Sequence, residues 1–342
     1  MRRMTACSGP RQLLLPMLLV TVGAFNALPS RAALPEPASH DWFEVRTPRF
    51  QIMGDVEPHQ LEQTALHLER MVRFFDVVMP GISADTTLVL PVYLFKSSAG
   101  FEAYRPNKPP GAGKLVGYHH FGSSGELIAM LGDDPEESRQ YISHEYMHSV
   151  LRHSFGWLPP WVNEGLAEYF STIDFTEHSV KLGGPISWSV QSLRRGFAPM
   201  CEFIAVDYDS PEYTGEGAGP FYAQSWGIMH ALMTSGLHGD SRTDELLQEL
   251  SHGVASSRAL AKVFGATACD SLGNVLRYYA TNLQFTVKLF KSPTLQFDLR
   301  IPSAHSLDRA GTLTQLGVLM AKNGGLGLPS AKEHSRAPRF PR

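Results

Sequence analysis

The sequence predicts an α+β fold, in which a mixed N-terminal sheet and a long helix are followed by a mainly helical lobe. Three observations carry this prediction. Short runs rich in β-branched and aromatic residues occur before residue 132, apolar residues recur at helical spacing from Leu61 to Phe75, and helical periodicity dominates after residue 190. With 342 residues, 43% of them hydrophobic, the chain can bury one sizeable core or two smaller ones.

Five runs are candidate strands of the N-terminal sheet, namely residues 43–46, 50–53, 87–95, 114–121 and 126–131. The third contains Pro91, which cannot donate to a ladder, so we expect this strand at a sheet edge or at a bulge. The last two flank a Gly-Ser-Ser-Gly turn and predict a hairpin. His119 and His120 lie on this hairpin, and we interpret them as ordinary polar strand residues.

A long helix is expected directly after the hairpin. Asp134 is its predicted N-cap, and Pro135 suits the first helical position, where no backbone N–H is needed. Gly156 is the predicted C-terminal stop. A second helix is expected to open at Pro159-Pro160 and to continue to about residue 171.

The first of these helices carries the H-E-x-x-H motif, at residues 144–148. Residues four apart on a helix share one face, with Cβ atoms about 5–6 Å apart, so His144 and His148 can bind one metal ion. Glu145 lies one position further round the helix. There a carboxylate can deprotonate a metal-bound water as general base instead of binding the metal.

The second helix offers the remaining ligand. A catalytic zinc ion has three protein ligands and one open position, and two histidines with one carboxylate are a common set. Glu164 is the candidate third ligand. Glu168 lies four residues on and can orient a ligand histidine, because metal-bound imidazoles usually donate their second N–H to a carboxylate or carbonyl. The sequence therefore predicts a zinc site formed by His144, His148 and Glu164.

The region after this site is predicted to be mainly helical, with helices near residues 191–195, 222–233, 244–250, 257–264 and 272–283. Residues 207–220 are rich in Gly, Pro, Asp and Glu, which is typical of a connecting loop, although a role in substrate access is an alternative. Calcium is a weak alternative for these acids, because they lack EF-hand spacing.

These motifs resemble the gluzincin zinc metallopeptidases, and most closely the peptidase MA-like family. The resemblance covers roughly residues 41–283 and rests on residues 144–148, 158–170 and 221–226, which read HEYMH, LPPWVNEGLAEYF and FYAQSW. It implies a zincin-like fold, zinc as cofactor, His144, His148 and Glu164 as its ligands, and Glu145 as general base. It also implies that the sheet edge beside the site pairs with an extended peptide substrate.

The family further implies a downstream tyrosine or histidine that stabilises the oxyanion. Tyr222 is the predicted residue and His230 the alternative. Both lie on one predicted helical face with Trp226, a pattern that also fits core packing. Eight helical residues separate the two candidates by about 12 Å, so they cannot both serve.

Residues 1–32 resemble a secretory signal peptide. They contain four arginines, no acid and a short apolar run, with a cleavage site expected after Ala32. An uncleaved anchor is the alternative. Removal of four positive charges changes the formal net charge from −3 to −7, which does not favour nucleic acid as a partner.

We expect Cys201 and Cys269 to be buried free thiols, with a disulfide as the alternative.

The expected organisation is a signal peptide at 1–32, a catalytic domain at 41–290, and a separate C-terminal region at 303–342. The catalytic domain divides into a sheet with the metal helix, at 41–156, and a helical lobe, at 157–290. Residues 316–324 resemble the first helix of the tetratricopeptide repeats that family members often carry, and no second repeat helix follows. Residues 329–342 are expected to be disordered.

Two functions are compatible with these features. The leading prediction is an exported, periplasmic or extracellular, zinc peptidase acting on peptide or protein substrates. The alternative is a non-catalytic module of the same fold that binds a peptide or a cell-envelope partner. The presence of Glu145 favours the enzyme, because metal binding alone does not need that residue.

Overall fold

The computed structural model of the chain describes residues 36–84, 87–106, 115–215, 218–234, 240–291, 295–323 and 334–336. The predicted signal peptide lies outside these ranges. Residues Pro35–Arg342 cluster into one compact unit. Helices and strands both contribute to it, as the predicted α+β class requires.

The described strands of the main sheet follow the order β10-β4-β5-β3-β2-β1-β9. Their bounds are β1 Trp42–Arg46, β2 Phe50–Gly54, β3 Leu90–Phe95, β4 Gly117–Gly122, β5 Gly125–Leu131, β9 His305–Leu307 and β10 His334–Arg336. Strands β2, β3 and β5 run parallel to one another, and the other pairs are antiparallel. The sheet is therefore mixed, and the predicted hairpin is confirmed as β4 and β5.

The expected edge position of the strand around Pro91 is wrong. Strand β3 lies between β2 and β5 in the interior of the sheet. The proline is tolerated because Leu90 directs its N–H to Arg49, on the β2 side, so position 91 faces the β5 side. The ladder with β5 begins only at Val92, which pairs with Ile128. Pro91 therefore lies just before the start of the β3–β5 ladder, and the Glu126 carbonyl of β5 accepts a hydrogen bond from Lys322 Nζ.

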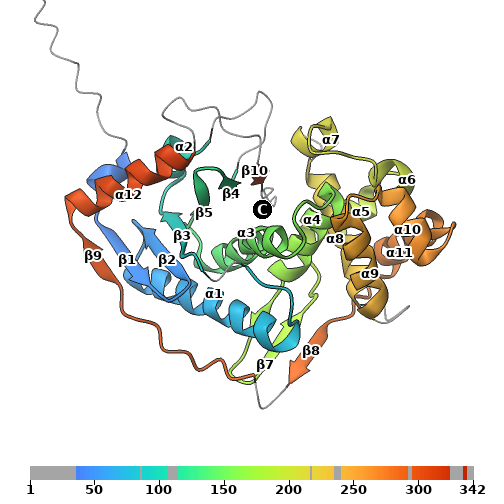
Figure 1. Ribbon diagram of the computed structural model, residues 1–342, viewed down its shortest axis with the longest axis horizontal. Helices are drawn as coiled ribbons and strands as arrows, with labels where there is room; N and C mark the ends of the chain where they lie inside the picture. The colour runs from blue at the N-terminus through green and yellow to red at the C-terminus, as the bar shows by residue number, and fades with distance from the viewer. Residues whose placement is uncertain are drawn as a thin grey trace, which may run out of the picture. The chain divides into compact units, whose positions relative to one another are not determined.

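Helices cover both faces of the sheet (Figure 1). The larger core lies between one face and the helices α1 Pro58–Val78 and α3 Pro135–Phe155. A smaller core on the opposite face involves η1 Glu36–Ser39, α2 Ser98–Tyr104 and α12 Arg309–Lys322. Helix α3, which carries the H-E-x-x-H motif, thus packs against β4 and β5 of the sheet.

The C-terminal region differs from the predicted division of the chain. Residues 303–323 are not a separate segment, because β9 pairs with β1 and α12 buries Leu316 and Leu319 in the smaller core. The apolar side chains of α12 pack against the sheet and not against a second repeat helix. Most of the tail expected to be disordered lies outside the described residues, but His334–Arg336 within it form β10 beside β4.

The helical lobe begins with α4 Pro160–Ser171 and contains the further helices and the small sheet β6-β7-β8. The bounds are β6 Asp174–Phe175, β7 Ser179–Leu182, α5 Ser187–Arg195, α6 Met200–Phe203, α7 Pro211–Thr214, α8 Ala218–Thr234, α9 Asp240–Ser251, α10 Ser256–Phe264, α11 Ala268–Asn282 and β8 Lys288–Lys291. Gly165 lets α8 approach α4 closely, since a Cβ there would lie 2.5 Å from the Ser225 carbonyl oxygen.

A disulfide joins Cys201 on α6 to Cys269 on α11, with Cα atoms 5.7 Å apart. The expectation of two buried free thiols is therefore wrong, because packing of α6 against α11 brings together two cysteines 68 residues apart. Neither cysteine is buried.

Among the helices of the described ranges, none has both the length and the apolar character needed to span a membrane.

Candidate metal centre

Helix α3 begins and ends where the sequence predicts. The Asp134 side chain accepts hydrogen bonds from the backbone N–H groups of Glu136 and Glu137, at 2.9 and 3.1 Å, and Pro135 occupies the first turn. Gly156 ends the helix with a φ of +70°, a conformation that glycine adopts without strain. The motif residues lie in the middle of the helix, where the backbone is held on both sides.

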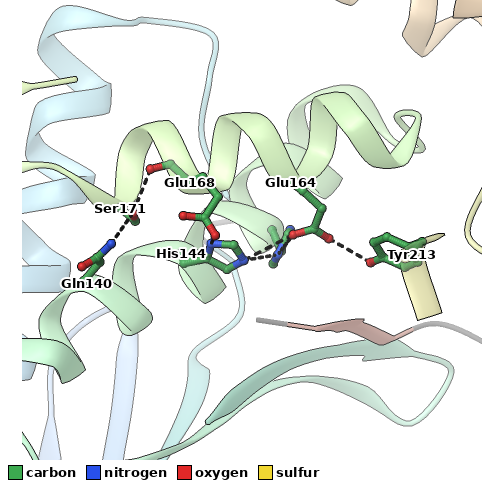
Figure 2. A network of polar contacts seen from close by, with 7 residues as sticks. Gln140, His144, Glu164, Glu168, Ser171 and Tyr213 are labelled. Atoms are coloured by element: carbon green, nitrogen blue, oxygen red, sulfur yellow. Dashed lines mark hydrogen bonds and ion pairs between the residues drawn. The ribbon is translucent and has the colours of Figure 1, made fainter. Parts of the chain in front are cut away.

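Helix α4 crosses next to α3 and supplies the acidic side chains. It starts at Pro160 and packs against both α3 and α8. Glu164 and Glu168, one helical turn apart, both point from α4 toward His144 (Figure 2). Both carboxylates are completely buried. Burial of two acids side by side is costly unless positive charge or hydrogen bonds compensate for it.

Three ligand atoms converge between the two helices. The Nε2 atoms of His144 and His148 are 3.1 Å apart, and the Glu164 Oε2 atom lies 3.4 and 3.6 Å from them. Donor atoms bound at 2.0–2.1 Å around a tetrahedral ion lie about 3.3 Å from one another. The three side chains therefore have the spacing of a tetrahedral metal site, and they form a group that can hold a metal ion.

The environment of these atoms also fits a cation. Glu164 Oε2 is buried and has no hydrogen-bond partner among the described residues. Burial raises the pKa of Glu164 to about 7, against the opposing effects of His148 and Tyr213, and lowers the pKa of both histidines to about 3. Two neutral imidazoles beside a carboxylate oxygen that lacks a hydrogen-bond partner among the described residues are suited to a divalent ion.

Glu168 lies behind the first histidine, as predicted for an orienting residue. Its Oε1 atom is 3.6 Å from His144 Nδ1, on the side of the ring opposite to Nε2. Burial and the charge of Glu164 raise the pKa of Glu168 well above its ordinary value. The Ser171 hydroxyl donates to the Glu168 carbonyl at 2.8 Å and contacts Gln140 on α3 (Figure 2). These contacts tie α4 to α3 beside the site.

The predicted general base, Glu145, is fully buried next to His144. Strand β4 passes close to it at Gly117, where a Cβ atom would contact Glu145 Oε1 at 3.4 Å and would lie tightly against Met130 Cβ at 3.1 Å. Position 117 therefore lies directly beside this carboxylate. Gly117 is a feature that the sequence reasoning missed, because nothing in the local sequence links it to the motif.

Tyr222, the predicted oxyanion stabiliser, lies at the site. Its ring centroid is 6.4 Å from that of His144, and the side chain is 2% exposed. Burial, together with the nearby Glu164 and other carboxylates, raises its pKa well above the ordinary value, so its hydroxyl keeps the proton. The alternative, His230, lies elsewhere on α8 and contacts the Tyr279 hydroxyl and the Gly183 carbonyl at 2.9 and 3.0 Å.

Tyr213 on α7 is a site residue that the sequence analysis missed. Its hydroxyl donates a 2.8 Å hydrogen bond to Glu164 Oε1 (Figure 2). It belongs to the segment interpreted as a connecting loop, and no spacing rule links it to a glutamate 49 residues earlier. Only the packing of α7 against α8 brings it to the site.

The hairpin histidines have polar partners, as expected for strand residues. His119 Nε2 lies 2.6 Å from Glu126 Oε1, and His120 Nε2 lies 3.1 Å from the Ser124 hydroxyl. The His119 ring also stacks near His148, at 6.4 Å between centroids. The outer edge of β4, expected to bind substrate, is paired with β10 of the same chain.

The candidate site is closed to solvent in this structure, because the three ligands, Glu145 and Tyr222 are each at most 2% exposed. Access for a substrate therefore requires a local movement. No protein-family model and no curated protein sequence matched this chain.

Proposed function

We propose that this protein is an exported zinc peptidase of the gluzincin type, with a zincin-like fold. The observation that carries the proposal is the convergence of His144 Nε2, His148 Nε2 and Glu164 Oε2 at 3.1–3.6 Å, with Glu145 beside them. When bound, zinc supplies a Lewis acid that lowers the pKa of its water to about 7 and polarises a substrate carbonyl.

The other steps belong to side chains of this chain. Glu145 takes the proton from the attacking water and delivers it to the leaving amine. Tyr222 keeps its proton because burial and nearby carboxylates raise its pKa, so it can donate a hydrogen bond to the carbonyl oxygen as negative charge develops there. Glu168 Oε1 lies 3.6 Å from His144 Nδ1, where a small shift would let it accept the second N–H of this histidine and orient the ring.

Metal content and peptide cleavage test this proposal together. The purified protein should contain about one zinc ion per chain and should cut some members of a library of unstructured peptides. Glu145→Gln should keep the zinc and lose activity by about 10²-fold or more. Glu137→Gln is the matched control, since it makes the same change on the same helix at an exposed position.

Two outcomes would contradict the proposal in different ways. If the wild type and Glu145→Gln bind zinc and are equally inert across the library, the protein is a non-catalytic module that binds a peptide or a cell-envelope partner. If the wild type binds no zinc after reconstitution, the metal centre itself is wrong. Burial of the whole site is the observation that favours the binding module.

Export is supported by two independent features. Residues 1–32 have the charge and apolar pattern of a signal peptide. The disulfide between Cys201 and Cys269 is of a kind that persists mainly in oxidising compartments, which include the periplasm and the extracellular space. Expression of the full chain in a bacterium should yield an exported protein that starts at Ala33. A cytosolic product with the intact N-terminus would overturn this part.

A further inference from the structure

Tyr213 and Glu164 form a buried pair at the centre of the candidate site. The tyrosine is 5% exposed, the glutamate is fully buried, and the hydroxyl donates to Glu164 Oε1 at 2.8 Å. A carboxylate that is a candidate metal ligand thus has one oxygen engaged by a side chain from a different segment.

The two oxygens of Glu164 have different surroundings. Oε1 accepts the bond from Tyr213, whereas Oε2 faces the Nε2 atoms of His144 and His148, at 3.4 and 3.6 Å. Oε2 has no hydrogen-bond partner within the described parts of the chain. A carboxylate held in this way offers a single oxygen to an ion.

We propose that Tyr213 is a positioning residue, which fixes the Glu164 carboxylate so that only Oε2 is presented to the metal. The inference rests on the metal site of the proposed function and does not require peptidase activity. Together with the two histidines, a single Glu164 oxygen would make up the three protein ligands that a catalytic zinc site uses.

The aromatic rings around Tyr213 hold its hydroxyl in place. Its ring packs edge-on against Tyr208 and Phe221, with centroids 5.3 and 5.7 Å away, and stacks on Tyr222 at 6.1 Å. Because packing fixes the position of the Tyr213 hydroxyl, this donor can hold the Glu164 carboxylate in one orientation.

Zinc affinity, measured by competition with a chromophoric chelator, tests the proposal. Tyr213→Phe removes only the hydroxyl and should weaken zinc binding by about 10- to 100-fold, the range found when a group that holds a metal ligand is lost. The matched control is Tyr279→Phe. It removes a buried hydroxyl in the same helical lobe, where the 2.9 Å contact is to His230 Nδ1 and not to a candidate ligand, and it should leave the zinc affinity unchanged.

The absorption spectrum of the cobalt-substituted protein gives a second readout. It reports the ligand geometry directly, and it should change in Tyr213→Phe but not in Tyr279→Phe. Combining Tyr213→Phe with Glu164→Gln should cost little beyond the glutamate change alone, because both act through one ligand.

Equal zinc affinity and equal cobalt spectra for the wild type and Tyr213→Phe would overturn the proposal. A Tyr213→Phe protein that does not fold would also overturn it, because the hydroxyl would then serve the fold and not the ligand. If the wild type binds no zinc, the proposal fails, because there is no metal for Glu164 to bind. If affinity depends on Tyr213 but no peptide is cut, the positioning role stands and the peptidase proposal fails.

Discussion

At the scale of single residues, burial controls the ionisation of the site. The pKa values of His144 and His148 fall to about 3, and that of Glu164 rises to about 7, in each case mainly because burial disfavours the charged form. The histidines are therefore neutral, as metal ligands must be. Glu164 carries its charge at little cost only when a cation lies beside it.

We expect zinc-free protein to lose stability, relative to zinc-free Glu164→Gln, as the pH rises from about 4.5 to about 7. The unfolded chain releases the Glu164 proton near pH 4.5, whereas the folded chain keeps it up to about pH 7, so the charge increasingly disfavours folding in this window. The difference in unfolding free energy should change by on the order of 3 kcal/mol.

Urea unfolding of both proteins at pH 4.5 and pH 7.5 measures this change. Repeating the comparison with zinc bound is the control, since the cation should remove the effect for the wild type. A constant difference between the two zinc-free proteins across the window would contradict the raised pKa of Glu164.

Gly117 offers a residue-scale test of the general base. Gly117→Ala adds a Cβ that would lie 3.1 Å from Met130 Cβ, so β4 has to shift slightly against β5. Because the same Cβ would contact Glu145 Oε1 at 3.4 Å, we expect this shift to disturb the carboxylate and to lower kcat severalfold. Zinc content should not change, because the metal ligands are not touched. Gly317→Ala, where an added Cβ meets nothing, is the control. An unchanged kcat would contradict the proposal that the position of the Glu145 carboxylate matters for the reaction.

At the scale of elements, the outer edge of β4 is the point where the structure differs most from the expected function. An extended peptide can add to a sheet only where backbone N–H and C=O groups are unpaired. Strand β10 pairs antiparallel with β4, from His334 opposite His120 to Arg336 opposite Tyr118 (Figure 1). A substrate that binds there has to replace this segment.

Removal of residues 324–342 should therefore lower KM for extended peptides severalfold, because β10 no longer competes for the β4 edge. Initial rates at several peptide concentrations measure it. Removal of residues 337–342 alone keeps β10 and serves as the control. Identical KM values for the full chain and the longer deletion would show that substrate does not use this edge.

At the scale of the whole molecule, the C-terminal helix is part of the N-terminal core. Leu316 and Leu319 on α12 are buried against residues of the sheet and α2 that precede them by about 200 positions. We expect Leu316→Ala and Leu319→Ala each to lower the free energy of unfolding by about 2–5 kcal/mol. Urea denaturation measures the change.

The matched control for this test is Val318→Ala on the same helix. Val318 is 37% exposed, so its truncation should cost far less than that of either leucine. Equal and small effects at all three positions would mean that α12 is an independent segment, as the resemblance to a repeat helix implied.

Local sequence signals were sufficient for the elements that carry the site. Capping at Asp134, the stop at Gly156 and the opening at Pro160 are properties of a few adjacent residues, and they predict α3 and α4 almost to the residue. The interior position of β3 was not predictable in this way. Pro91 signals an edge, and only the register with β5 shows that it lies just before the start of that ladder.

The sequence by itself determined the candidate ligands, since four-residue spacing places His144 and His148 on one helix face whatever surrounds the helix. Tertiary structure alone decided how Glu164 meets them, that Tyr213 holds its second oxygen, that Cys201 pairs with Cys269, and that β10 covers the β4 edge. These contacts join segments far apart in the chain. Their geometry depends on the packing of whole elements, which local spacing does not encode.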